Sequence, residues 1–395
     1  AEVQVDFSQI NDGDFTKVKE KATGDFGKSF SDITVSGELS DSNGNIEFVM
    51  EKGKITASYI NQSKVPNTYG YDSLSYEINK KYSVDSDIGV DMMYQGYVYY
   101  PDATSDDSQE DSKELCKYLQ ADGYFNMVMC EDKDNVYTTI NTATLKRKDE
   151  AGIVKNNAIY KFNKESKETS RVVDVNMHTE GKYIESIACN DKYIYLLINE
   201  SEKYSIVVYD KESTQEVKAK DIEIYVDLDS FAKTIAKEYE EEYRKVKNYE
   251  VQDNGYDMYA NEYGIVIIHK SVVAEVDESD PKHYGEKGYN NVYEEKGIEP
   301  FVKEVYTVSS FSTADGDIQL DNSHVCMTNY IYDFVYYKNG LTYILTNVYS
   351  SDADVLDKVK VTSLSNGKIF EEININLNKI SNTSGSKTLK YLMMK

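Results

Sequence analysis

The chain has 395 residues, and its 69 acidic side chains outnumber its 44 basic ones to give a formal net charge of −25. So acidic a chain repels phosphate backbones, which argues against nucleic-acid binding. Its apolar runs, such as Ile265 to Ile268, are far too short to cross a bilayer, so no transmembrane helix is expected.

Composition also bears on compartment and ligands. The chain begins Ala1-Glu2-Val3 without Met, as a mature protein does after signal-peptide removal, although a shortened chain would begin in the same way. We expect an exported protein, extracellular or at the cell surface, with a lipid anchor upstream of residue 1 as one form of attachment. Trp is absent, which weakens the case for a dedicated glycan platform, although Tyr can substitute. The codon bias of an AT-rich genome explains the 36 Tyr as well as a functional role does.

The first expected strands lie near the N-terminus, at residues 30–39, 46–50 and 55–60. Asn43-Gly44 supplies the positive φ that a tight hairpin needs. A further strand is expected at 388–394. Pairing an N-terminal strand into the last sheet of a circular array removes the open edge, and we expect these strands to close a ring.

An internal repeat carries the fold prediction. Each unit has a polar turn, a strand of aromatic and branched residues, a loop, a second strand and a turn of Asn, Asp, Lys or Gly. The pattern occurs at Cys130–Tyr137 with 159–166, at Cys189–Tyr195 with 206–213, and more faintly from Tyr94, Asn261 and Tyr337. One such sheet cannot bury both faces alone, and packing several around an axis gives a β-propeller.

Five units are visible, and the N-terminal strands can supply more. We therefore predict one all-β domain over residues 1–395, a β-propeller of about six or seven blades with one or two inserted helices. Units such as Ile206 to Glu212 resemble the degenerate repeats of exported Gram-positive β-propeller proteins, over about residues 85–375. The resemblance implies a scaffold without fixed catalytic residues. No WD dipeptide or kelch double glycine places the chain in either of those subfamilies.

Two helices interrupt the strand pattern. Residues 230–247 follow a predicted N-cap at Asp229 and Ser230 and carry one apolar stripe with Lys and Glu opposite. This helix is expected to lie on the propeller, with partner docking as the alternative. A shorter helix is predicted at 108–119.

The four cysteines are Cys116, Cys130, Cys189 and Cys326, without a CxxC pair or a His at zinc spacing. They allow two disulfides in three connectivities, or buried thiols. Cys130 and Cys189 fall at equivalent repeat positions, which favours packing over catalysis. We expect them not to be linked, because adjacent blades pack about 10 Å apart, farther than a disulfide reaches.

The long segment 277–299 is the candidate recognition loop, since loops of this length in compact folds are functional or disordered. Tyr, Gly and Asn combine rigid aromatic contacts with adaptable hydrogen bonding. The predicted ligand- or partner-binding residues are His283, Tyr284, Tyr289, Asn290 and Tyr293. The remaining histidines, at 178, 269 and 324, have no metal-binding spacing, and His269 is interpreted as a satisfied strand residue.

No cofactor is expected, with Ca²⁺ as the alternative. Calcium takes six to eight oxygen ligands, and Asp315, Asp317 and Asp321 form a weak candidate site, as do 11–14 and 352–357. None has EF-hand spacing, and hairpin turns are rich in Asp, Asn and Gly for backbone reasons alone.

No hydrolase, zinc-protease, P-loop or dinucleotide motif occurs, and 69 acidic residues are too many to single out a catalytic pair. The leading hypothesis is a non-enzymatic extracellular or cell-surface module that binds a protein or carbohydrate through loops on one propeller face. One alternative is a secreted carbohydrate-active enzyme, a glycoside hydrolase or lyase with carboxylates in the central channel. Another is a structural module of a surface assembly.

Overall fold

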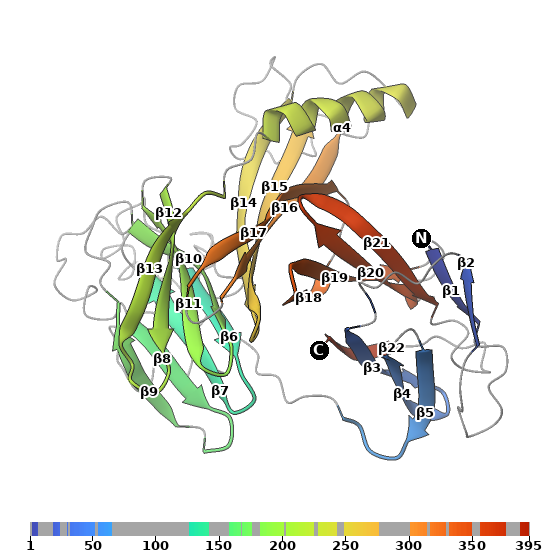
Figure 1. Ribbon diagram of the computed structural model, residues 1–395, viewed down its shortest axis with the longest axis horizontal. Coiled ribbons are helices and arrows are strands. Elements are labelled where there is room, and N and C mark those ends of the chain that lie inside the picture. The colour runs from blue at the N-terminus through green and yellow to red at the C-terminus, as the bar shows by residue number, and fades with distance from the viewer. Residues whose placement is uncertain are drawn as a thin grey trace, which may run out of the picture.

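The structure of the chain is a computed structural model. It describes residues 2–6, 19–23, 30, 32–51, 54–64, 126–141, 158–166, 168–175, 182–200, 203–224, 228–242, 249–275, 301–313, 317–328, 332–349, 356–376 and 388–394. Within these residues, no helix is long and apolar enough to span a bilayer. The strands form five sheets (Figure 1), each built on four antiparallel strands, and each sheet is one blade of a β-propeller.

The first three blades are simple meanders. Blade 1 has β6 (Asn126–Glu131), β7 (Asn135–Asn141), β8 (Ala158–Asn163) and β9 (Thr169–Asp174). Blade 2 has β10 (Lys182–Cys189), β11 (Tyr193–Glu200), β12 (Lys203–Asp210) and β13 (Glu216–Ile222). Blade 3 has β14 (Tyr249–Ala260), β15 (Gly264–Glu275), β16 (Val302–Ser312) and β17 (Gln319–Thr328).

The last two blades involve both ends of the described chain. Blade 4 has β18 (Tyr332–Lys338), β19 (Leu341–Tyr349), β20 (Leu356–Ser365) and β21 (Lys368–Asn376), and its edge is extended by β1 (Glu2–Asp6) and β2 (Lys19–Thr23). Blade 5 has β22 (Thr388–Met394) as its first strand, followed by β3 (Thr34–Asp41), β4 (Gly44–Glu51) and β5 (Lys54–Ile60). Strands far apart in sequence therefore share one sheet.

The predicted all-β propeller is confirmed, but the predicted six or seven blades are wrong: the described residues form five blades and one helix. The prediction counted the N-terminal strands as additional units. In the structure, β3–β5 form a complete blade only together with β22, and β1–β2 extend blade 4. The predicted unit at Tyr94 and the predicted helix 108–119 lie outside the described residues. Of the predicted helix 230–247, the structure describes α4 (Leu228–Glu242).

The hydrophobic core lies between neighbouring blades, because side chains of a strand alternate between the two faces of its sheet. Blades 1 and 2 enclose one cluster, which includes Tyr137, Ile159, Cys189, Ile194 and Leu196. Blades 2 and 3 enclose the next, which includes Ala188, Tyr195, Leu197, Ile265 and Ile267. Blade 2 thus buries both of its faces, as the repeat requires.

The structure corrects the predicted equivalence of Cys130 and Cys189. The N–H of Asp132 bonds the carbonyl of Asn135, and the N–H of Asn190 bonds the carbonyl of Tyr193, so Asp132 and Asn190 hold the same hairpin position. Cys130 lies two residues before that position and Cys189 one. A shift of one residue reverses the face of a strand side chain, so the cysteines are not equivalent. The sequence alignment of the repeats missed this shift because Asp-Lys follows both cysteines at the same spacing.

Blade 3 is longer than its neighbours. Its strands have 12, 12, 11 and 10 residues, whereas the strands of blade 2 have 8, 8, 8 and 7. Helix α4 lies across the extended ends of β14–β16 (Figure 1). Ala232, Ile235 and Ala236 of α4 form a separate small core with Val273 and Phe301. The extension is therefore a packed part of the fold.

Candidate functional site

Two groups of polar side chains connect neighbouring blades. The first lies at the hairpin face, defined here as the end of each blade that carries the turn between its first and second strands. In blades 1, 2 and 3 this turn begins at Asp132, Asn190 and Asn261. The side-chain oxygen of each accepts hydrogen bonds from backbone N–H groups two and three residues later. Such Asx turns hold the hairpins in one conformation.

The same turn positions also bond to the neighbouring blade. Asn190 Nδ2 donates to the carbonyl of Asn261 at 3.0 Å, and Asn261 Nδ2 donates to the carbonyl of Tyr337 at 2.7 Å. In blade 4, Lys338 Nζ donates to the carbonyl of Asp32, just before blade 5, at 2.8 Å. A side chain thus reaches forward at each of the junctions 2–3, 3–4 and 4–5.

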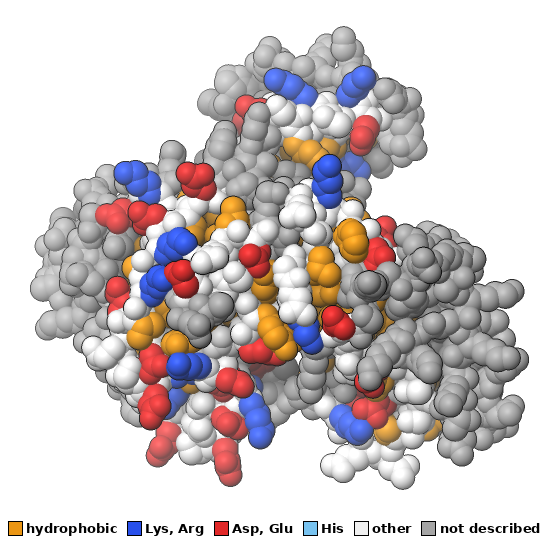
Figure 2. Space-filling model, viewed as in Figure 1, with side chains coloured by type: hydrophobic (Ala, Val, Ile, Leu, Met, Phe, Trp, Pro, Cys, Tyr) orange, Lys and Arg blue, Asp and Glu red, His pale blue; other side chains and the backbone are white. Residues whose placement is uncertain are grey.

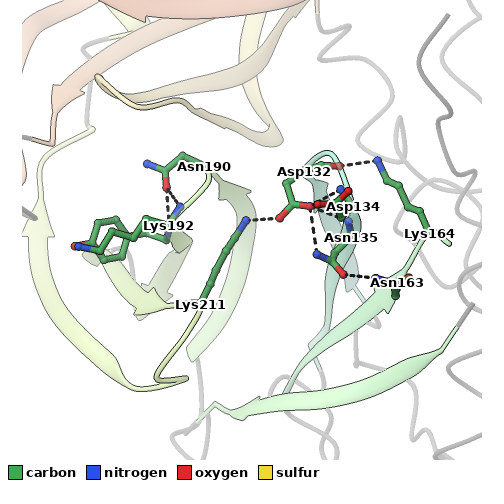
Figure 3. Close-up of polar contacts among 9 residues, drawn as sticks. Asp132, Asp134, Asn135, Asn163, Lys164, Asn190, Lys192 and Lys211 are labelled. Atoms are coloured by element: carbon green, nitrogen blue, oxygen red, sulfur yellow. Dashed lines mark hydrogen bonds and ion pairs between the residues drawn. The ribbon is translucent and has the colours of Figure 1, made fainter. Parts of the chain in front are cut away.

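At the junction between blades 1 and 2, a side chain of the later blade reaches back to the earlier one (Figure 3). Asp132 stands where the next two blades have Asn, and a carboxylate has no proton to donate. Lys211, from the second hairpin of blade 2, instead reaches back to Asp132 Oδ2 at 2.6 Å and lies 4.5 Å from the centre of the Tyr137 ring. Lys164 Nζ donates to the Asp132 carbonyl at 2.7 Å.

The charges at this junction are matched. Burial acts to raise the pKa of Asp132, but Lys211 and the N–H groups of Asn135 and Asp134 outweigh it and hold that pKa below its usual value. Burial, with the nearby Asp132 charge, raises the pKa of Tyr137, so this phenol stays protonated. Over blades 1 and 2, acidic and basic side chains are interspersed (Figure 2). The hairpin-face contacts therefore fasten neighbouring blades together.

The second polar group lies between blades 2 and 3, farther from the hairpin face. Tyr204 and Tyr256 share a hydrogen bond of 2.7 Å between their hydroxyls, and Tyr256 stacks on His269 with ring centres 4.4 Å apart. On the blade 2 side, Asn199 Nδ2 donates to Glu185 Oε1 at 2.9 Å. We call Glu185, Asn199, Tyr204, Asp253, Tyr256, His269 and Ser271 the 2–3 polar cluster.

Backbone irregularities position the two carboxylates of this cluster. The register of β10 shifts between Ile184 and Ser186, which leaves Glu185 as the extra residue, and the register of β14 shifts between Asp253 and Tyr256. Bulges redirect side chains and are common next to functional sites. The first strands of two successive blades thus each contribute an acid to this cluster, and burial, the Tyr204 hydroxyl and both acids raise the pKa of Tyr256.

The cluster does not have the geometry of a Ser-His-Asp triad. Asp253 Oδ1 lies 3.2 Å and Ser271 Oγ 3.4 Å from the same His269 nitrogen, Nε2, whereas a triad uses both ring nitrogens. Ser271 is also buried. Burial acts to raise the pKa of Asp253, but His269 and the Gly255 N–H hold it below its usual value. His269 is thus a strand residue with polar partners.

The predicted recognition residues His283, Tyr284, Tyr289, Asn290 and Tyr293 lie outside the described residues, as does Asp315. Asp317 forms an ion pair with Lys218 and accepts a hydrogen bond from Gln319. Asp321 is exposed on β17. Among the described residues, no group of three or more His, Cys, Asp or Glu side chains is arranged to hold a metal ion. The calcium prediction stays untested, because part of its site is not described.

Sequence reasoning missed both polar groups. For the hairpin face, the available signal was Asp or Asn at the first turn position of three successive units. These residues were explained by turn formation alone. The 2–3 polar cluster had no such signal, because its members come from five strands and no two are adjacent in sequence.

Comparison with known proteins adds little beyond the fold. No protein-family model matches the chain, and no curated protein matches it. Solved structures similar to it include hydrazine synthase of Kuenenia stuttgartiensis, at 11% identity and a TM-score of 0.24, covering 61% of this chain and 52% of that one. A prolyl endopeptidase has 8% identity and a TM-score of 0.24, with 69% and 42% covered. The chain thus spans about half the length of these two structures or less.

A third similar structure is the β-propeller domain of the Trilobed protease from Pyrococcus furiosus, which has an open velcro topology. It has 8% identity and a TM-score of 0.21, with 69% of this chain and 98% of that chain covered. These similarities are too low to carry any argument about activity.

Proposed function

We propose that this chain is a non-enzymatic binding module that recognises a protein or carbohydrate through the connection at the extended end of blade 3. The observation that supports the proposal is the extension itself, which α4 packs against. Extra strand length and a dedicated helix core are not needed to complete a blade, since blades 1 and 2 lack the added length.

The extended end of blade 3 gives that connection a firm base. The N–H of Glu275 bonds the carbonyl of Phe301 at 2.8 Å, so the chain leaves and re-enters blade 3 at a hydrogen-bonded pair. Phe301 is buried, and its ring lies 4.9 Å from the ring of Tyr239 in α4. Binding loops are commonly carried by a rigid scaffold of this kind.

The proposal predicts the effect of replacing Tyr284, Tyr289 and Tyr293 together by alanine. Aromatic anchors contribute about 2 kcal/mol or more each at interface centres, so the triple variant should lose a micromolar interaction entirely. Its Tm should stay within about 2 °C of wild type, because surface changes away from a core cost little. The measurement is binding to a glycan array and to immobilised surface proteins.

The matched control replaces exposed apolar side chains of other blades, Val217 and Phe370, by alanine, and should bind as wild type does. Unchanged binding by the triple Tyr variant would contradict the proposed site. A large fall in Tm would contradict the surface role of the three tyrosines.

The 2–3 polar cluster favours the second candidate, a carbohydrate-active enzyme, because Glu185 and Asp253 come from the first strands of adjacent blades and both raise the pKa of Tyr256. Glycosidases use such a pair of carboxyl groups. The test is hydrolysis of a polysaccharide by the wild-type chain. If Glu185→Gln and Asp253→Asn each abolish this hydrolysis while keeping the wild-type Tm, the enzyme is favoured over the binding module. Export to the extracellular space or cell surface remains part of our proposal and rests on composition.

A further inference from the structure

Two free cysteines meet between blades 1 and 2. Cys130 lies on β6 and faces blade 2, whereas Cys189 lies on β10 and faces blade 1. This opposition follows from the one-residue shift between the two repeats, which places the side chains on opposite faces of their sheets. Both side chains pack into the same hydrophobic cluster between the blades, and β6 and β10 are neighbouring strands. Both are free thiols in the structure.

The surroundings make the two sulfurs unequal. Cys189 is buried in the cluster formed by Ile194, Leu196 and Tyr209, while Cys130 packs at the edge of that cluster and is partly exposed. Burial, then the Cys189 thiol, raises the pKa of Cys130, although Lys211 acts in the opposite direction. A thiol with a raised pKa is a smaller fraction thiolate, so we expect the pair to exchange slowly with a dissolved disulfide.

We propose that Cys130 and Cys189 are a modification site, at which a dithiol–disulfide exchange links the first strands of blades 1 and 2. The oxidant is a disulfide, such as glutathione disulfide. Cys130, the more exposed residue, attacks it as the thiolate, forms a mixed disulfide and releases one glutathione thiolate. The Cys189 thiolate then attacks the Cys130 sulfur, forms the Cys130–Cys189 bond and releases the second glutathione. The two protons lost by the cysteines are taken up by the two glutathione thiolates.

The sequence analysis predicted no disulfide between Cys130 and Cys189 because packed sheets lie about 10 Å apart. That spacing does not hold at every position in two neighbouring blades. The first strands of successive propeller blades converge toward the axis, and β6 and β10 are direct neighbours. At this position both cysteines lie in one cluster between neighbouring strands, so the spacing of the sheet planes does not set the distance between the two thiols. A link between distant sequence positions restricts the unfolded chain, which stabilises the folded state.

The test incubates the folded wild-type chain in a glutathione redox buffer, blocks the remaining thiols and maps peptides without reduction. We expect the Cys130 and Cys189 peptides to be joined, and the Tm to rise by about 5 °C on oxidation and to return on reduction. Cys130→Ser and Cys189→Ser should show neither change, while Cys116→Ser, the matched control, should show both.

The peptide map of the wild type decides the question even if a variant fails to fold. Two blocked free thiols after full equilibration would overturn the proposal. So would a stable glutathione adduct on Cys130 that Cys189 does not displace, or pairing of either residue with Cys116 or Cys326.

Discussion

Replacing Gly264 by alanine should lower the free energy of unfolding by about 3 kcal/mol, because overpacking against groups that cannot move aside is strongly destabilising. A Cβ at this position would lie 2.3 Å from the carbonyl oxygen of Phe311 and 2.5 Å from Cδ1 of Tyr337. Phe311 belongs to the same blade and Tyr337 to the next, and both are buried. Gly264 thus allows blades 3 and 4 to approach closely at the hairpin face.

The matched control is Gly340→Ala, in the first hairpin of blade 4. Gly340 has a φ of +77°, and a methyl group added to its Cα would meet nothing within 4 Å, so only backbone strain is added. This variant should lose about 1 kcal/mol. Both values come from urea unfolding followed by circular dichroism. A Gly264→Ala loss no larger than that of Gly340→Ala would contradict the close approach of blades 3 and 4.

Replacing Asn261 by aspartate should cost about 2 kcal/mol, the cost expected when a buried acceptor loses its donor. Aspartate can still accept the N–H groups of Tyr263 and Gly264, which Asn261 Oδ1 accepts at 2.9 and 3.1 Å. It cannot donate to the carbonyl of Tyr337, and it places a negative charge beside that oxygen. The substitution therefore removes the inter-blade bond while keeping the turn.

Asn163→Asp is the matched control for this effect. Asn163 Oδ1 also accepts two backbone N–H groups of its own turn, from Glu165 and Ser166, but its Nδ2 donates within blade 1, to Asn135. Thermal unfolding monitored by calorimetry should show a clear fall in Tm for Asn261→Asp and little change for Asn163→Asp. Equal effects would mean that the turn, not the bond between blades, matters at Asn261.

Much of the propeller could be predicted from local sequence, because each blade is built from hairpins whose turn residues and strand alternation are adjacent in the chain. The strands around Tyr195 and Val208 were found in this way. The number of blades could not be predicted in this way, since it depends on which strands pair across the whole chain. Nothing local in Thr388–Met394 indicates that β22 pairs with β3.

The contacts between blades were still harder to predict from the sequence. Asp132 and Asn190 suit a turn equally well, and only the arrangement of neighbouring blades shows that one accepts from Lys211 and the other donates to Asn261. The cysteine repeat misled for a related reason: Cys130 and Cys189 align by spacing to Asp-Lys, whereas hydrogen-bond register decides which face a side chain takes. His269 could be recognised as a strand residue, but not its stacking on Tyr256.

The most direct test of the ring is whether β22 and β3 pair in blade 5. Ser36 and Met393 are register partners across these strands, whereas Val49 lies one strand farther, opposite Ser36. Cross-strand partners have Cβ atoms about 5 Å apart, and strands two apart are separated by about 10 Å. We expect Ser36→Cys with Met393→Cys to be joined by a short thiol cross-linker, identified by peptide mapping, and Val49→Cys with Met393→Cys to remain unlinked. Failure of the first pair, or equal cross-linking of both, would contradict the five-bladed arrangement.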